Sequence, residues 1–148
     1  MTYDEALAYL DEHATYEKTG RIESPSTETI EAFCAAMGDP QHAAPVIHLT
    51  GTNGKGSTAQ MISRLLVASG LTVGTYTSPH LERVNERVSR NREPISDDDF
   101  AEQIAAVADL EAIVGRRPGY FEIMTAAACR WFADVAVDVE VVEVGLLG

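Results

Sequence analysis

Apolar and polar residues along the chain follow two periods, one typical of amphipathic helices and one typical of buried strands. Apolar side chains recur three or four positions apart in five stretches, and each stretch predicts a helix. The predicted helices cover roughly residues 2–16, 24–37, 57–69, 96–114 and 120–135. Short apolar runs predict strands at 46–49, 71–76 and 137–144. A strand, a crossover helix and a second strand predict a parallel, right-handed βαβ unit, and therefore an α/β fold with helices flanking a mostly parallel sheet.

Polar residues and glycine mark where these helices begin and end. Thr2 and Glu5 have the spacing of a capping box, and Ser24–Pro25 supplies an N-cap followed by proline at the first helical position. Ser96 precedes three aspartates, whose charge is favourable at the N-terminal end of a helix. Gly70 is placed to end the third helix in a left-handed conformation.

Two segments, residues 17–23 and residues 77–94, lack clear periodicity and predict loops. The second segment carries four arginines, Arg83, Arg87, Arg90 and Arg92. In an otherwise acidic chain they predict a local positive patch that faces the phosphate end of a nucleotide. The alternative is a solvated surface loop, because loops often carry charge for solubility.

The segment between the first predicted strand and the third predicted helix is rich in glycine. Three glycines allow successive backbone N–H groups to turn inward, where the N-terminus of the following helix also favours an anion. Lys55 adds a positive charge for the same phosphates, and the hydroxyl of Ser57 or Thr58 is suited to a magnesium ion. The sequence therefore predicts a phosphate-binding turn made of Gly51, Thr52, Asn53, Gly54, Lys55, Gly56, Ser57 and Thr58, which the family resemblance given below assigns to ATP.

The spacing of this turn departs from the common G-x-x-x-x-G-K-[ST] pattern. Leu49 stands where that pattern has its first glycine, and Gly56 separates the lysine from the hydroxyl. The alternative interpretation is a glycine-rich turn with a solvent-exposed lysine. The order of strand, turn and helix favours phosphate binding.

The last predicted strand carries a carboxylate at its C-terminal end, with glycine close behind. Glu143 is therefore the candidate magnesium ligand, because this ion typically takes one or two carboxylates together with water and phosphate oxygens. Glu140 is the competing candidate, but period-two alternation places it on the opposite face of the strand. A third interpretation is that either glutamate points to solvent from an edge strand.

Composition narrows the class of protein further. The chain has 148 residues, which suggests one domain, and 45% of them are hydrophobic, which is typical of a globular protein. Its 23 acidic and 11 basic side chains give a net charge of -12. This charge disfavours nucleic acids and anionic membranes as partners, and it predicts a surface adapted to a salt-rich cytoplasm. No apolar run is long enough to span a membrane and the first residues lack a basic signal-peptide start, so a cytoplasmic location is expected.

Five short motifs follow one another in the order Gly51–Ser57, Tyr76–Leu81, Asn85–Val88, Tyr120–Glu122 and Glu143–Leu146. Together they resemble the motifs of the folylpolyglutamate synthase and dihydrofolate synthase family, in the Mur ligase superfamily. The resemblance implies a P-loop-containing α/β fold, that of the Mur ligase central ATPase domain, in truncated form. It also implies that residues 1–148 are an incomplete N-terminal ATP-binding domain, without the C-terminal domain that binds glutamate.

The activity implied by this resemblance is that of an ATP-dependent amide ligase. In the family, ATP phosphorylates a carboxylate of folate or dihydropteroate, and the amino group of L-glutamate then attacks the acyl phosphate. The implied cofactors are ATP and Mg²⁺, and the complete protein is expected to be a monomer. By position, the catalytic residues would be Lys55 and Glu143, and the metal ligands would be Ser57, Ser78 and Glu143. The pterin would be bordered by Gly119, Tyr120, Phe121, Glu122 and Arg83.

The end of the chain departs from the family pattern. Family members usually read Glu-Val-Gly-Leu-Gly-Gly followed by an arginine, an Asp-Ala-Thr-Asn run, a metal-binding histidine and a modified lysine. Leu147 replaces the first glycine of the final pair, and the sequence ends at Gly148. We therefore expect that this chain by itself does not complete the catalytic cycle.

Several other functions compete with this interpretation. One is a Mur-type ligase that acts on cell-wall precursors, although Ser78–His80 and Asn85–Arg87 favour the folate branch. Another is a nucleotide-binding switch without chemistry, but a GTPase would carry an Asn-Lys-x-Asp signature that the sequence lacks. A third is a fragment that binds ATP and has no activity. The sequence does not distinguish dihydrofolate synthesis from polyglutamate extension.

Overall fold

The computed structural model describes residues 1–19, 26–51 and 53–143, except for the side chains of residues 15–19. The chain divides into two compact units. One consists of Met1–Gln41 and Asp97–Trp131, and the other of His42–Ser96 and Phe132–Gly148. No helix within the described residues is both long and apolar enough to cross a membrane.

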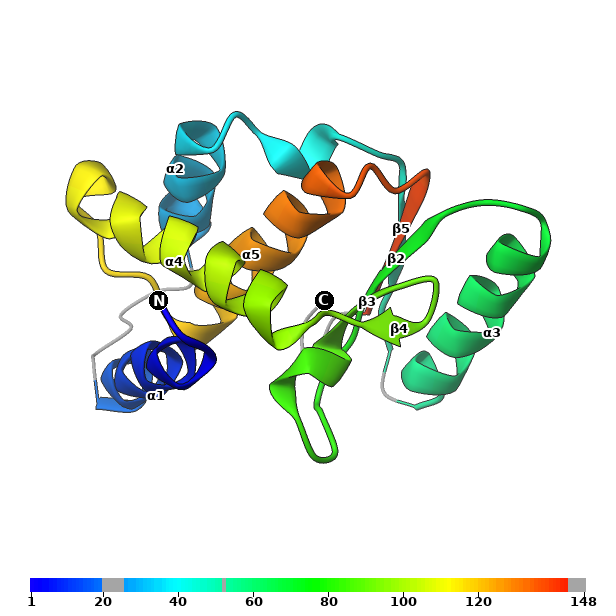
Figure 1. Cartoon of the computed structure of the whole chain (residues 1–148), viewed down its shortest axis with the longest axis horizontal. Coiled ribbons are helices and arrows are strands. Elements are labelled where there is room, and N and C mark those ends of the chain that lie inside the picture. The colour runs from blue at the N-terminus through cyan, green and yellow to red at the C-terminus, as the bar shows by residue number, and fades with distance from the viewer. Residues whose placement is uncertain (20–25, 52, 144–148) are drawn as a thin grey trace. The chain divides into compact units, whose positions relative to one another are not determined.

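The first unit is built from helices (Figure 1). They are α1 (Tyr3–Thr19), α2 (Glu28–Ala36), α4 (Asp97–Val114) and most of α5 (Tyr120–Asp134), and a 3₁₀ turn η1 (Pro40–His42) follows α2. Both α1 and α2 pack against α4. The apolar stripes predicted from the sequence supply the core, in which the side chains of Ala6, Leu10, Phe33, Phe100, Ile104 and Val107 are at most 2% exposed.

The N-terminal end of α1 follows the predicted capping box. The backbone N–H of Thr2 donates to Glu5 Oε2 at 2.6 Å, and the N–H of Glu5 donates to Thr2 Oγ1 at 3.2 Å. The C-terminal end differs from the prediction, since the helix continues to Thr19. The predicted loop at residues 17–23 is therefore wrong for residues 17–19. Glutamate and lysine in this stretch are good helix formers even without an apolar face.

The start of α2 also differs from the sequence-based expectation. The helix begins at Glu28 with Thr27 as its N-cap residue, and the Ser26 hydroxyl accepts the N–H of Glu28 at 3.2 Å. Ser24–Pro25, the predicted start, lies outside the described residues. Several capping residues occur in succession, so local propensity alone does not select which one is used.

The second unit contains a five-stranded mixed sheet with the order β1-β5-β2-β3-β4. Its strands are β1 (Val46–Leu49), β2 (Val73–Tyr76), β3 (Val88–Arg90), β4 (Glu93–Pro94) and β5 (Val139–Glu143). β5 pairs in parallel with both β1 and β2, while β3 and β4 extend the sheet antiparallel. The α/β prediction is confirmed. Because β5 lies between two strands, the edge-strand interpretation of its glutamates is wrong.

Helix α3 (Lys55–Ala68) covers one face of this sheet (Figure 1). Its buried Ala59 packs with Val73, Val139 and Val141, surrounded by the partly buried side chains of Ile47, Leu49, Ile62, Leu66 and Val67. Gly70 ends the helix with φ of +90°, as predicted. On the opposite face, Gly74 lies so close to Phe132 that an added Cβ would be 2.6 Å from the ring.

The segment 77–94 is more regular than predicted. It contains a 3₁₀ turn η2 (Val84–Arg87), then β3 and β4, which are joined through Asn91 and Arg92 with φ of 49° and 69°. Positive φ at both central residues is typical of a tight two-residue hairpin. The side chain of Asn91 also accepts the N–H of Val73 at 2.8 Å. Strands of two or three residues are too short to show a period in sequence, so the loop prediction missed them.

Candidate functional site

The three parallel strands end at one edge of the sheet. In the strand register, Leu49 of β1 lies beside Glu143 of β5, and Tyr76 of β2 lies beside Val142. The glycine-rich turn follows β1, and Ser78 follows β2 by two residues. The turn, Ser78 and Glu143 therefore share the carboxyl edge, where open α/β sheets bind their ligands.

Glycine is required in the turn because of its backbone conformation. Gly51 has φ of 139°, and Gly54, the N-cap residue of α3, has φ of 75°. The first hydrogen bond of α3 runs from the N–H of Thr58 to the carbonyl of Gly54 at 2.9 Å. The three N–H groups of residues 55–57 precede that bond, so they point toward the turn as donors without an intrahelical partner.

The side chains of the turn differ in their exposure. Asn53, Ser57 and Thr58 are exposed, and Lys55 is half-buried. Thr52, which was predicted to bind ATP, lies outside the described residues. The exposed hydroxyls and the donors of the helix N-terminus together give the turn the chemistry of an anion site.

The Glu143 carboxylate lies next to this helix N-terminus. Its Oε2 atom is 3.9 Å from the position that a Cβ on Gly56 would occupy. The Glu143 side chain is only 8% exposed, and burial raises its pKa, while the positive charge of Lys55 acts in the opposite direction. Glu143 therefore lies at the glycine turn, within electrostatic reach of Lys55. A carboxylate in this position is stabilised by any cation that binds beside it.

Glu140, the competing candidate, lies on the other face of the sheet. Its register partner on β2 is Gly74, which packs against Phe132 and not against α3. The Glu140 side chain is 1% exposed, and burial raises its pKa to about 7. The predicted alternation is confirmed, and Glu143 is the glutamate of β5 at the turn.

Ser78 is half-buried and precedes a cis bond to Pro79. The loop that follows is held by Glu86, whose Oε1 accepts the N–H groups of Leu81 at 2.8 Å and Glu82 at 3.0 Å. These backbone hydrogen bonds lower the pKa of Glu86. The carboxylate thus fixes the shape of the loop after Ser78.

Two further motif residues also have structural partners. Arg87 Nε donates to His80 Nδ1 at 2.8 Å, and the buried amide of Asn85 donates to the carbonyl of Ile95 at 2.8 Å. The polar side chains of this motif therefore build the loop and tie it to the chain that enters α4.

The predicted arginine patch is divided by the fold. The N–H of Thr77 donates to the carbonyl of Arg87, so Arg87 lies near the carboxyl edge, and the exposed Arg83 precedes it by four residues. β3 then runs antiparallel to β2, which pairs Arg90 with Gly74 and leads Arg92 farther from that edge. A single patch of four arginines facing the phosphate end is therefore wrong, because β3 reverses direction within the segment.

The predicted pterin-binding residues other than Arg83 lie in the helical unit, at the start of α5. The buried N–H of Gly119 donates to Glu122 Oε1 at 3.2 Å, and the N–H of Ile123 donates to the carbonyl of Gly119 at 3.0 Å. Tyr120 is half-buried, and Phe121 is 49% exposed. An exposed aromatic face at a fixed helix start is a suitable surface for stacking on a planar ring.

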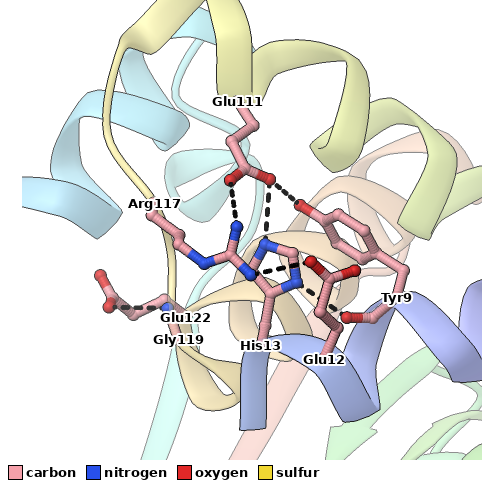
Figure 2. Close-up of polar contacts among 7 residues, drawn as sticks. All are labelled: Tyr9, Glu12, His13, Glu111, Arg117, Gly119 and Glu122. Carbon is pink, nitrogen blue, oxygen red and sulfur yellow. Dashed lines mark hydrogen bonds and ion pairs between the residues drawn. The ribbon is translucent and has the colours of Figure 1, made fainter. Parts of the chain in front are cut away.

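Sequence interpretation missed a polar cluster in the same unit, drawn in Figure 2. Its centre is Glu111 of α4, which contacts Tyr9 and His13 of α1. A signal was present, because His13 continues the buried stripe of Ala6 and Leu10 at helical spacing. A histidine at a core position needs hydrogen-bond partners, and its place in the stripe indicates that they come from a packed neighbour.

These features define the class of protein. A glycine-rich turn between a parallel strand and a helix, with a buried carboxylate at the end of the adjacent strand, is typical of α/β domains of the P-loop type.

The comparisons with known proteins identify the family. No family model matches the chain. The chain is 41% identical over 153 residues to a folylpolyglutamate synthase of Lacticaseibacillus casei, covering 100% of the chain and 35% of that relative. A folylpolyglutamate synthase structure from Thermotoga maritima has a TM-score of 0.88 at 37% identity, over 99% of the chain and 34% of the other. A solved complex of folylpolyglutamate synthase with AMPPCP and folate has a TM-score of 0.86 at 39% identity, over 100% of the chain and 36% of the other.

The chain belongs to the folylpolyglutamate synthase/dihydrofolate synthase family. It spans only 17% to 35% of the length of the curated relatives that match it over its whole length. Family membership favours the folate branch over a ligase for cell-wall precursors.

Proposed function

We propose that this chain is the nucleotide-binding part of an ATP-dependent ligase that joins L-glutamate to a carboxylate of folate or dihydropteroate. The observation that supports it best is the position of Glu143, whose buried carboxylate lies beside the N-terminal turn of α3 and near Lys55. Such a site combines donors for phosphate with an oxygen ligand for a metal ion.

Each residue of the turn has a role in this proposal. The backbone N–H groups of residues 55–57 bind phosphate oxygens, and the Lys55 ammonium offsets the charge that builds up as the γ-phosphate moves to the acceptor carboxylate. Leu49 in place of a first glycine does not alter these donors, because they come from the helix start.

The residues present also fit a magnesium ion. Glu143 supplies a carboxylate whose burial is unfavourable unless a cation compensates it, and Ser57 and Ser78 supply hydroxyl oxygens. A bound magnesium ion supplies charge neutralisation between the phosphate groups. Glu143, Ser57 and Ser78 would hold that ion beside the turn, and the backbone donors of the turn would orient the triphosphate.

The pterin ring is proposed to lie against Gly119–Glu122, with the exposed ring of Phe121 as the stacking surface. Arg83, which is exposed on the loop after Ser78, is proposed to attract the anionic tail of the substrate. We also propose a cytoplasmic location and a monomeric state for the whole protein.

Nucleotide titration tests the proposal on this chain. ATP should bind in the presence of Mg²⁺, and Lys55→Ala should weaken binding by tenfold or more because it removes the side-chain cation. Arg64→Ala is the matched control, since Arg64 is an exposed cation on the same helix and away from its N-terminus. Equal ATP affinity in wild type and Lys55→Ala would contradict the proposal.

The substrate class is tested separately by adding dihydropteroate, folate or a UDP-muramyl compound to the ATP-loaded chain. We expect dihydropteroate or folate to stabilise the ATP-loaded chain against heat and the UDP-muramyl compound to have no effect. Stabilisation by the UDP-muramyl compound alone would place the chain among cell-wall ligases, and ATP binding without any such effect would favour a nucleotide-binding fragment.

A further inference from the structure

The Glu111 carboxylate joins three segments of the helical unit (Figure 2). Its Oε2 atom accepts the Tyr9 hydroxyl at 2.7 Å and lies 3.0 Å from His13 Nε2. Its Oε1 atom lies 3.6 Å from Arg117 Nη1, in the connection between α4 and α5. Arg117 Nη2 in turn donates to Glu12 Oε1 at 3.1 Å. One carboxylate thus links α1, α4 and the segment that leads into α5.

The hydrogen bonds of His13 require a proton on the pair that it forms with Glu111. His13 Nδ1 lies 2.8 Å from the backbone carbonyl of Tyr9, which can only accept, so Nδ1 carries a hydrogen. With a neutral ring and an ionised Glu111, the other nitrogen and the carboxylate would face each other as two acceptors at 3.0 Å. Because His13 is only 2% exposed, water has little access to its ring, although Glu111 is 23% exposed. The contact is favourable when one additional proton lies on His13 or Glu111.

The groups that face this pair come from α1 and from the connection between α4 and α5. Tyr9 and Glu12 lie on the same helix as His13, and Arg117 lies on the connection. Burial raises the pKa of Tyr9, and its hydrogen bond to Glu111 adds to that shift, so the phenol remains a donor. The arginine is the permanent cation of the cluster.

We infer that Tyr9, His13 and Glu111 form a positioning unit that holds the segment from Arg117 to Glu122 in place. Arg117 is separated from the first residue of α5 only by Pro118 and Gly119, both buried. Once Arg117 is held by Glu111 and Glu12, the start of α5 has little freedom, and the half-exposed Phe121 is presented in a defined place. The positioning role follows from these contacts. Its consequence, that the cluster controls pterin affinity without touching the pterin, rests on the proposed function.

Hydrogen exchange at the amides of Gly119 and Ile123 tests the inference directly. Both amides make the hydrogen bonds that start α5. Glu111→Gln and Arg117→Gln should accelerate their exchange by tenfold or more relative to the amides of Ile104 and Val107 in α4, and Arg117→Lys should restore part of the protection. The matched control is Arg116→Gln, because the neighbouring Arg116 pairs with Glu28 on α2 at 3.2 Å and not with Glu111. That variant should leave the two amides unchanged.

Tyr9→Phe removes a single oxygen from the cluster and serves where Glu111→Gln fails to fold. Unchanged exchange at Gly119 and Ile123 in the variants, or equal acceleration throughout the helical unit, would overturn the inference.

Pterin affinity gives a second readout that separates the two proposals. If wild type binds dihydropteroate, Glu111→Gln should weaken binding, because the apparent affinity falls with the fraction of molecules in which the start of α5 is correctly placed. If wild type binds no pterin while the exchange result holds, the proposed function fails and the positioning unit stands.

Discussion

Glu143 Oε2 lies 3.9 Å from the place that a Cβ atom on Gly56 would occupy. These two residues belong to β5 and α3, which are separated by more than 80 positions in sequence, and the parallel pairing of β5 with β1 brings them together. The relationship joins a buried carboxylate to a helix N-terminus, and two predictions follow directly from it.

Glu143→Gln should remove most of the effect of Mg²⁺ on ATP binding. The amide keeps the size of the side chain but loses the charge that a divalent cation requires, so we expect the gain in ATP affinity on adding Mg²⁺ to fall by tenfold or more. Calorimetric titration with and without Mg²⁺ measures this. Glu140→Gln is the matched control, because Glu140 is on the same strand but faces away from α3. In this variant Mg²⁺ should raise ATP affinity as much as in wild type.

Gly56→Ala should fold normally and bind Mg²⁺-ATP several times more weakly. The new methyl group would make an ordinary contact at 3.9 Å, but it would occupy the space between the turn and the carboxylate. Gly70→Ala, at φ of +90° on the other end of α3, should instead destabilise the fold by about 1 kcal/mol and leave ATP affinity unchanged. Normal ATP affinity in Gly56→Ala would show that this space is not used by the ligand.

Glu140 should make stability fall between about pH 4.5 and pH 7. Its pKa is raised from 4.5 to about 7 in the folded state, so within this window the folded state keeps a proton that the unfolded state releases. The free energy of unfolding therefore decreases as pH rises, by about 3 kcal/mol across the window. Urea denaturation at pH 4.5 and pH 7.5 measures the effect.

Glu140→Gln should abolish that difference, because the amide has no proton to release. Glu93→Gln, at an exposed position on β4, should retain the full difference. The same pH dependence in wild type and Glu140→Gln would mean that another group is responsible.

Gly74→Ala should destabilise the sheet unit by 1–3 kcal/mol, the usual cost of overpacking. The added Cβ would lie 2.6 Å from Phe132 Cδ1, which neither the strand nor the ring can accept without moving. Combining it with Phe132→Leu should recover part of the loss, because the smaller side chain leaves room for the methyl group. Thermal denaturation of both single variants and the double variant measures the coupling, and strict additivity would contradict the packing explanation.

The acidic surface should make stability depend on salt. With a net charge of -12, repulsion between carboxylates is screened as ionic strength rises, so the free energy of unfolding should increase from low salt to molar KCl. Equal or greater stability in low salt would remove the idea of a surface adapted to a salt-rich cytoplasm.

Much of the local structure could be predicted from the sequence. The strand at 46–49, the glycine turn, the capping box of Thr2 and Glu5 and the left-handed end of α3 at Gly70 depend on neighbours within about four residues. For the same reason, the opposite orientation of Glu140 and Glu143 followed from alternation along one strand.

Predictions from the sequence were wrong or missing for features that depend on partners far along the chain. The β3–β4 hairpin is too short to show a period, and only its pairing with β2 defines it, which also divides the arginines of that segment. The central place of β5 was likewise not visible, because period two does not tell a central strand from an edge strand.

The sequence by itself determined the family motifs, the main helices and the composition of the phosphate-binding turn, because each is encoded in a short run of residues. Only the tertiary structure decided that Glu143 lies beside Gly56 at the end of a central strand, and that His13 and Arg117 both contact the carboxylate of Glu111. The contacts of Glu143 with Gly56 and of His13 with Glu111 join residues more than 80 positions apart, and their geometry is set by strand register and helix packing, which no local pattern contains.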